Sequence, residues 1–415
     1  MTNVVAPPQS RKVTLSNGVR VLLEELPHVH SASIGFWVDT GSRNETPEIE
    51  GASHFIEHML FKGTPSRSAL AIARALEDTG GSLNAFTNKE QTCYYARVLE
   101  DQVELALDVL SDMLLHSLFD PDEVKRERKV ILEEIKMYED NPDEYASELF
   151  QTVFWPDHPM GRPIAGTRNS VRRLSREALL AYKDRFYAAD RLVVSIAGRI
   201  DGDKVVAQLE RLLADLPRKS APHTLTTPTA STRRVVKYRD TEQVQVLLGT
   251  DGVSVDHPDL YIHHMLDAIL SGGMSARLFQ QVREKRGLCY SISSYGAHHR
   301  LGGMFGIYAG TNARKVDDLL AVTFEELQRP ITHEELDRAK RQTRGNLLLA
   351  LEQPRTRANR MARNELFHGR FIPIEEILER MEAITVEQVS DLAARMAPDQ
   401  FSFTIVGPLR RIKAL

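Results

Sequence analysis

The sequence contains few cysteines and no long apolar segment. Two of its 415 residues are cysteines, Cys93 and Cys289, and neither belongs to a CxxC pair, which excludes a disulfide framework. No apolar run approaches the roughly 18 residues that a membrane-spanning helix requires. The first residues, MTNVVAPPQSRKVTL, lack the apolar core of a signal peptide. We therefore expect a cytoplasmic protein with no membrane span.

The composition also lacks an excess of basic residues. The formal net charge is -4 and no basic run interrupts the chain, which argues against a nucleic-acid partner. Hydrophobic residues make up 42% and charged residues 27% of the sequence, as in globular proteins. A length of 415 residues exceeds that of one ordinary hydrophobic core and suits two domains.

The two halves of the sequence resemble each other on either side of a linker. Residues 216–233 are rich in Pro, Thr and Ser and lack periodicity, which is typical of a linker. The stretch YARVLEDQVELALDV from Tyr95 matches YAGTNARKVDDLLAV from Tyr308, and the halves end on similar strands, LVVSIAGRI and FSFTIVGPL. The sequence therefore predicts two homologous domains, over residues 1–215 and 234–415.

Hydrophobic periodicity predicts an α+β fold for both domains, with mainly antiparallel strands and separate helices. The predicted strands cover residues 18–25, 31–39, 83–87, 91–98, 244–250, 289–296 and 303–310. Besides the helix of the motif described next, the predicted helices cover residues 68–78, 101–115, 121–139, 258–270 and 275–285.

The stretch GASHFIEHMLFKGT, residues 51–64, places two histidines and a glutamate on one side of a predicted helix. The other positions are mostly apolar, so the helix is expected to be buried. Buried imidazoles and carboxylates need partners, and a divalent cation at His54 and His58 would satisfy both histidines and Glu57. The order H-x-x-E-H is the inverted form of a zinc-peptidase motif. The alternative is two core histidines bonded to backbone carbonyls beside a surface glutamate.

A second predicted helix, which begins at Asp120, supplies two further carboxylates. Glu127 and Glu134 lie two turns apart along the edge of its apolar stripe, whereas Glu133 points away from it. A buried salt bridge, for example to a basic neighbour on the same helix, is the alternative for Glu127.

The second half has lost all but one of these groups. When the halves are aligned, the positions of His54, Glu57, His58, Glu127 and Glu134 are occupied by His263, Leu266, Asp267, Ala339 and Asn346. Because these groups are replaced only in the second half, the first half is predicted to carry the function.

Two imidazoles and one carboxylate predict a catalytic zinc site with one ion per chain, in which His54, His58 and Glu134 bind the metal. Glu57 would act as the general base toward the attacking water. Glu127 would orient a ligating histidine. Such a site suits hydrolysis of an unactivated amide.

These motifs resemble the pitrilysin/insulinase family of inverted-motif zinc peptidases. They are most similar to the branch of the mitochondrial processing peptidase β subunit and its single-chain bacterial relatives. The resemblance rests on HFIEH, on the glutamate in ERKVILEEI, and on SIGFWVDTGSRNE, LNAFTNKEQTCYYARVL and SGGMSARLFQQVREKRGLCYSI. It covers nearly the whole chain and implies a clam-like peptidase chamber, of which one chain forms half.

The resemblance implies further site residues. Arg283 and Tyr290 would contact the substrate backbone and the developing oxyanion, although the residues alone leave Arg286 as an equal rival. A substrate peptide would bind as an added strand beside Leu83, Asn84, Ala85 and Phe86.

The resemblance also implies partners. We expect the substrates to be extended, unfolded peptides or presequence-like segments, with Glu144 and Glu148 receiving a substrate arginine. A homodimer is expected, and a heterodimer with a homologous subunit is the competing assembly. Two other functions are considered: a metal-dependent S-ribosylhomocysteine lyase, which is a shorter protein with a cysteine ligand, and a non-catalytic subunit of a processing-peptidase-like complex.

Overall fold

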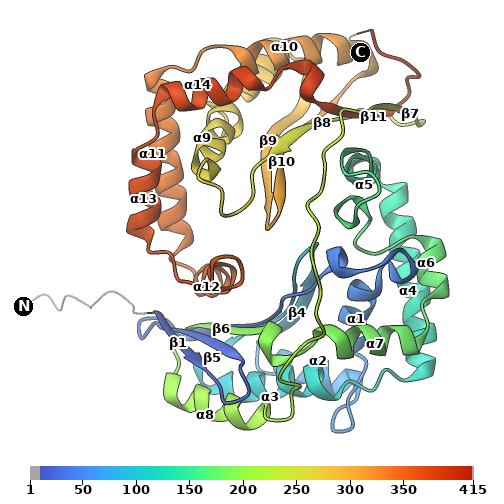
Figure 1. Ribbon diagram of the computed structural model, residues 1–415, viewed down its shortest axis with the longest axis vertical. Helices are drawn as coiled ribbons and strands as arrows, with labels where there is room; N and C mark the ends of the chain where they lie inside the picture. The colour runs from blue at the N-terminus through green and yellow to red at the C-terminus, as the bar shows by residue number, and fades with distance from the viewer. Residues whose placement is uncertain (1–9, 414–415) are drawn as a thin grey trace, which may run out of the picture. The chain divides into compact units, whose positions relative to one another are not determined.

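The computed structural model describes residues 10–413, whose contacts divide into two units that are not contiguous in sequence (Figure 1). The first unit comprises the residues up to 135 together with 163–224 and 350–371. The second comprises 136–162, 225–349 and the residues from 372 onward. Each unit thus includes a segment from the other half of the sequence. The predicted division into domains at residues 1–215 and 234–415, with a linker at 216–233, stays a prediction.

The first unit is built on a six-stranded sheet with the order β1-β2-β6-β3-β5-β4. Its strands are β1 Ser10–Thr14, β2 Arg20–Glu25, β3 Ser31–Val38, β4 Ser82–Thr87, β5 Thr92–Leu99 and β6 Leu192–Gly198. The β2–β6 pair is parallel and all other pairs are antiparallel. The most buried strands are β3 and β6, in the middle of the sheet, which is why they read as nearly continuous apolar runs.

Helices cover both faces of this sheet. They are α1 Ala52–Leu60, α2 Ala69–Glu77, α3 Val103–His116, α4 Pro121–Asp140, α6 Arg168–Arg173, α7 Arg176–Phe186, α8 Gly202–Leu212 and α12 Pro354–His368. Helix α12 comes from the second half of the sequence, yet it contacts β2, β3 and β6. Its buried Ala358, Met361 and Ala362 share one hydrophobic cluster with Trp37 and Cys93 of the sheet.

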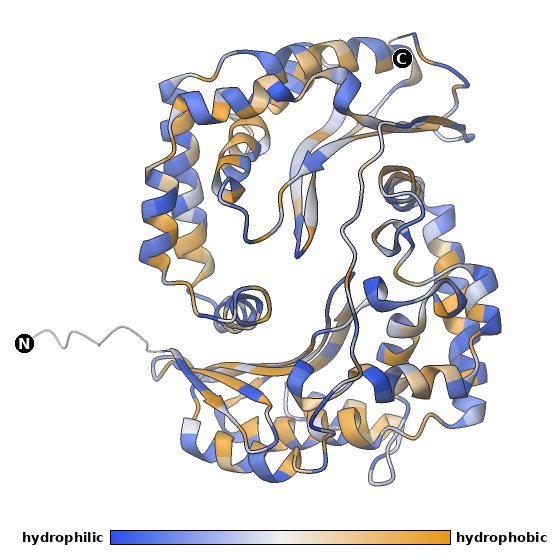
Figure 2. Cartoon of the chain, viewed as in Figure 1, coloured by the Kyte–Doolittle hydropathy of each residue, from blue (hydrophilic) through white to orange (hydrophobic). Residues whose placement is uncertain are grey.

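The second unit has a five-stranded sheet with the order β7-β11-β8-β10-β9. Its strands are β7 Arg234–Tyr238, β8 Val244–Gly252, β9 Cys289–His299, β10 Gly302–Thr311 and β11 Ser402–Gly407. Its helices are α5 Pro142–Phe154, α9 Leu260–Ser271, α10 Val316–Gln328, α11 His333–Ala350, α13 Ile374–Glu382 and α14 Val386–Arg395. Hydrophobic and hydrophilic segments alternate along α11, α13 and α14, as expected of helices with one buried face (Figure 2).

Helix α5 belongs to the first half of the sequence but contacts β8 and β11 of the second sheet. Its Phe150 and Phe154 are buried in one cluster with Leu247 and Met304. The two halves of the chain therefore exchange one helix each, since α12 covers the first sheet and α5 the second.

The α+β prediction is confirmed, and so is the shared topology of the two halves. Without β1, the first order reads β2-β6-β3-β5-β4, which matches β7-β11-β8-β10-β9 strand for strand. In each sheet the one parallel pair joins the first and last of these strands. The helix predicted at 275–285 is confirmed, and its residues Phe279–Glu284 form a π-helix. Of the helices between residues 10 and 413, none has the length and apolar character to cross a membrane.

Candidate metal centre

Helix α1 is fixed by its buried apolar side chains and by a carboxylate at its first turn. Phe55, Ile56, Met59 and Leu60 are fully buried. The Glu45 side chain accepts hydrogen bonds from the backbone N–H groups of Gly51 at 2.8 Å and Ser53 at 2.7 Å, which would otherwise lack partners at a helix start. Burial raises the pKa of Glu45 to about 7. This cap sets the angle at which α1 presents its polar side.

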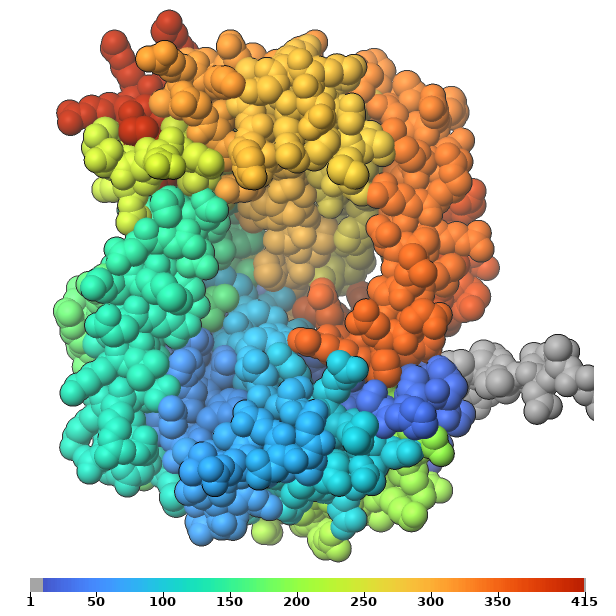
Figure 3. Space-filling model, turned by 180° about the vertical axis from the view of Figure 1, so that it is seen from behind, coloured from blue at the N-terminus to red at the C-terminus, as the bar shows by residue number. Residues whose placement is uncertain are grey.

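Helix α4 is a surface helix with one buried face, and its segment is coloured teal in the view from behind (Figure 3). It begins as predicted, because Asp120 Oδ1 accepts hydrogen bonds from the N–H groups of Asp122 and Glu123. Along it, Glu127 is 4% exposed, Glu134 is half-buried and Glu133 is exposed. The two carboxylates predicted to face inward do so.

The structure brings His54, His58 and Glu134 together. The Glu134 carboxylate oxygens lie 3.8 Å from His54 Nε2 and 3.7 Å from His58 Nε2. One ligand atom from each residue falls within 4.8 Å of the others, and no other group between residues 10 and 413 has this geometry. Ligands on a tetrahedral zinc at about 2.1 Å are separated by about 3.4 Å, so the three atoms fit such an ion with a small contraction.

The histidines differ in their protonation. Burial, and then the nearby His58, lowers the pKa of His54 to about 4, so its ring is neutral at pH 7 and has a lone pair to donate. Burial also opposes protonation of His58, but the hydrogen bond and negative charge of Glu127 outweigh it and raise the pKa of His58. A metal at this position would displace that proton.

Glu127 contacts His58 directly. Its Oε1 lies 2.7 Å from His58 Nδ1, and its Oε2 forms an ion pair with Lys62 Nζ at 2.6 Å. Burial would raise the pKa of Glu127, but the bonds from His58 and Lys62 lower it, so Glu127 is a carboxylate and Nδ1 is the donor. This bond fixes the ring so that Nε2 faces Glu134. The predicted alternative, a buried salt bridge, is also present, but its partner is Lys62 and not a basic neighbour on α4.

Glu57 lies on the same side of α1. Its Oε2 accepts a hydrogen bond from Thr87 Oγ1 at 2.6 Å, and Thr87 is the last residue of β4. Burial raises the pKa of Glu57, against the opposing effects of Thr87 and His58. A raised carboxylate pKa near a metal is suited to accepting a proton from water at neutral pH.

The predicted substrate strand lies at the sheet edge. In the described structure β4 pairs with β5 alone, so its other edge is open. Asn84 is exposed, whereas Leu83, Ala85 and Phe86 are half-buried. The N–H of Ala85 donates to the side-chain Oδ1 of Asn84 at 2.7 Å, so rotation of that amide would release it for an incoming strand.

The remaining predicted residues belong to the second unit. The guanidinium of Arg283 lies 5.8 Å from the ring centre of Tyr290, which is 74% exposed. The rival Arg286 instead bonds Gln281 and pairs with Glu325, so the structure favours Arg283 as the neighbour of the tyrosine. Glu144 and Glu148 lie on α5, with Glu144 exposed and Glu148 half-buried.

Sequence reasoning missed Glu45, Lys62 and Thr87 as members of this centre. Lys62 follows α1, and its ion pair with Glu127 on another helix has no signal in the local sequence. Thr87 directly follows the segment predicted to bind substrate, and this position was the only sequence signal that it lies near the metal centre. Nothing in the loop around Glu45 indicates that its side chain caps α1.

Comparison with known proteins decides the family. Residues 20–168 match the family described as insulinase (peptidase family M16), and residues 173–343 match the family described as peptidase M16 inactive domain. A Bacillus subtilis protein, named the uncharacterized zinc protease YmxG, is 40% identical over 402 residues, which cover 96% of this chain and 98% of that protein. The chain belongs to the insulinase family, M16.

Other relatives agree with this assignment. An uncharacterized zinc protease of Streptomyces coelicolor is 39% identical over 412 residues, covering 96% of this chain and 90% of that one. A protease from Helicobacter pylori has the same fold, with a TM-score of 0.89 at 21% identity over 97% of this chain and all of that one. A chain of Complex III2 from Candida albicans shares the M16 fold too, with a TM-score of 0.83 at 20% identity over 96% of each chain.

Proposed function

We propose that this M16 chain is a zinc metalloendopeptidase that hydrolyses extended, unfolded peptides or presequence-like segments. The observation that carries the proposal is the convergence of His54, His58 and Glu134, with Glu57 on the same side of α1. The names of the bacterial relatives support zinc as the ion, and the single group of candidate ligands between residues 10 and 413 supports one ion per chain. When bound, zinc lowers the pKa of water toward neutrality and polarises a carbonyl.

Residues of the first unit transfer the proton, orient a metal ligand and bind the peptide backbone. Glu57, held by Thr87 at 2.6 Å, accepts the proton of the attacking water and returns it to the leaving amine. Glu127 keeps the Nε2 of His58 directed at Glu134. The open edge of β4 pairs with the peptide backbone at Leu83 to Phe86, which selects an extended conformation more than a side-chain sequence.

The second unit contributes the other proposed residues. Arg283 and Tyr290, which adjoin each other, contact the substrate backbone and the developing oxyanion. Glu144 and Glu148 receive a substrate arginine, and cleavage of peptides with Arg or Ala near the scissile bond by Glu144→Ala and Glu148→Ala tests that role. Each chain carries both sets of residues, which supports a homodimer that encloses a clam-like chamber. The near absence of cysteine supports a cytoplasmic location.

The deciding experiment compares wild type with Glu57→Gln on an unstructured peptide mixture, together with zinc content. We expect Glu57→Gln to retain zinc and to lose hydrolysis, because an amide cannot accept the proton. Glu133→Gln, an exposed neighbour of the third ligand, is the control and should remain active. Full activity of Glu57→Gln would remove the proposed base. Absence of hydrolysis by zinc-loaded wild type would favour the second candidate, a non-catalytic or heterodimer-dependent subunit.

A further inference from the structure

A basic cavity lies on the α12 side of the first sheet. Its volume is about 510 Å³, and it is formed by the start of α12 and by neighbouring residues of β3, β4 and β5. The polar side chains that line it include Ser82, Tyr95, Arg97, Gln353, Arg355 and Asn359. All lining residues belong to the first unit, so the cavity is a feature of one packed body.

The cavity contains two arginines and no acid. Neither Arg97 nor Arg355 forms an ion pair within residues 10–413, and both are exposed. The guanidinium of Arg355 lies 4.7 Å from the ring centre of Tyr95, which holds it over the sheet. By contrast, Arg357 on the same helix is paired with Glu24 at 2.6 Å. The positive charges of Arg97 and Arg355 are therefore not neutralised by an acidic side chain at this cavity.

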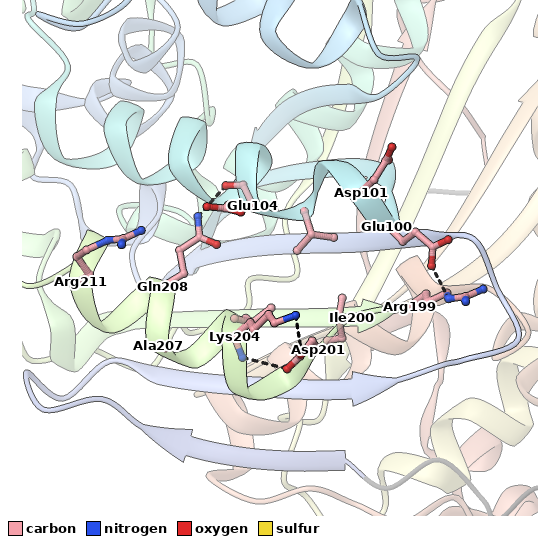
Figure 4. A pocket seen from close by; sticks show the side chains of 12 residues that line it. Glu100, Asp101, Glu104, Arg199, Ile200, Asp201, Lys204, Ala207, Gln208 and Arg211 are labelled. Carbon is pink, nitrogen blue, oxygen red and sulfur yellow. Dashed lines mark hydrogen bonds and ion pairs between the residues drawn. The ribbon is translucent and has the colours of Figure 1, made fainter.

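Another cavity of the same unit shows the opposite arrangement. It has a volume of about 660 Å³ and is lined by residues of α3 and α8 (Figure 4). There Glu100 pairs with Arg199, and Lys204 lies 3.3 Å from Asp201. Its acids and bases largely neutralise each other, so it gives no reason to expect a charged ligand.

The basic cavity and the metal centre lie at opposite ends of strand β4. Ser82, the first residue of β4, is the cross-strand partner of Arg97, and Thr87, the last residue, bonds Glu57. Thr87 follows Ser82 by five positions, which span about 17 Å at about 3.3 Å per residue. Side chains alternate between faces, so a peptide added along β4 directs every second side chain toward the α12 face.

We propose that Arg97 and Arg355 form a subsite that binds a carboxylate of the substrate peptide, about four or five residues from the cleaved bond. The proposal rests on the peptidase function proposed above. Planar guanidinium groups bind carboxylates through paired hydrogen bonds, and the side chains of Asn359 and Gln353 offer further donors. Antiparallel pairing is the commoner arrangement, and it places this carboxylate on the C-terminal side of the cleaved bond.

The test uses quenched fluorescent peptides of one apolar sequence in which a single Asp, Ala or Lys is moved stepwise from the scissile bond. The C-terminus is amidated in one series, and in a second series a peptide with a free carboxylate ends at the same position. Wild type is compared with Arg97→Gln, Arg355→Gln and the double variant. Arg211→Gln, an exposed arginine of the cavity in Figure 4, is the matched control. Binding of the same peptides to zinc-loaded Glu57→Gln is measured by fluorescence anisotropy.

We expect an Asp at the fourth or fifth position to raise kcat/KM and affinity about three- to tenfold over Ala, because two exposed charge pairs are gained. The gain should fall with added salt and vanish in the double variant but not in Arg211→Gln. A gain confined to the free-acid series assigns the subsite to the peptide terminus, and a gain in the amidated series assigns it to a side chain. A gain on the N-terminal side supports the subsite with parallel pairing.

Equal binding of Asp, Ala and Lys peptides, or a preference that persists in the double variant, would overturn the proposal. Because binding is measured without turnover, it separates this outcome from failure of the peptidase proposal, in which peptides bind but are not cleaved.

Discussion

The contact between Glu127 and His58 allows a quantitative prediction. Replacing Glu127 by Gln keeps the size of the side chain and one oxygen that can accept from His58 Nδ1, but it removes the charge that now lies 2.7 Å away. Loss of a carboxylate that orients a metal-binding histidine weakens metal affinity about 10- to 100-fold, or about 1.4 to 2.7 kcal/mol. We expect Glu127→Gln near the lower value and Glu127→Ala near the upper one, because Ala also removes the hydrogen bond.

The assay is a zinc competition titration against a chromophoric chelator. Glu133→Gln is the control, since Glu133 is an exposed carboxylate on the same helix. Unchanged zinc affinity in both Glu127 variants would refute the claim that this carboxylate orients a ligand.

The same pair predicts how the stability of the metal-free protein depends on pH. The pKa of Glu127 is lowered by His58 and Lys62 against burial, so its stabilisation is present above the ordinary glutamate pKa and is lost as the pH falls through the lowered value. The pKa of His58 is raised by Glu127 against burial, so its stabilisation is present at low pH and is lost as the pH rises through the raised value. The Tm difference between wild type and Glu127→Gln should therefore be largest between these two pKa values.

Two further predictions concern the second unit. A Cβ at position 249 would lie 2.4 Å from Phe150 Cζ, so Gly249→Ala should lower the free energy of unfolding by about 1 to 3 kcal/mol in urea titrations, and Phe150→Leu should recover part of the loss. An unperturbed Gly249→Ala would show that α5 does not cover this sheet closely. Burial, and then the nearby His298, lowers the pKa of His263 to about 4. Between this pKa and the ordinary histidine value, the unfolded chain binds a proton at His263 that the folded protein does not bind. Stability should then fall by up to about 3 kcal/mol as the pH drops from about 6.5 to 4, and His263→Gln should flatten this slope; equal slopes would remove His263 as its source.

Much of the metal centre could be predicted because its residues lie on two helices whose buried faces can be recognised from the local sequence. Helical periodicity places His54, Glu57 and His58 on one side of α1, and the apolar stripe of α4 distinguishes Glu127 and Glu134 from Glu133. The side chains grouped in this way lie together in the structure. Their roles in catalysis stay proposals.

What could not be predicted depends on contacts between distant segments. An amphipathic helix shows that one of its faces is buried but not which sheet buries it, so the exchange of α5 and α12 between the halves left no local signal. The same holds for Glu45, whose role as a cap of α1 depends on the path of a loop. The segment Phe279–Glu284 was predicted as a helix without its π-helical type, because the hydrophobic patterns of α- and π-helices differ little over so short a segment.

The central claim is that a carboxylate from α4 completes a cation site begun by two histidines of α1. It is tested most directly by counting the zinc bound per chain in wild type and in Glu134→Gln, after dialysis against a weak chelator. We predict one zinc per wild-type chain and its loss in Glu134→Gln, with the fold of both proteins intact by circular dichroism. Zinc retained by Glu134→Gln with the affinity of wild type would contradict the claim.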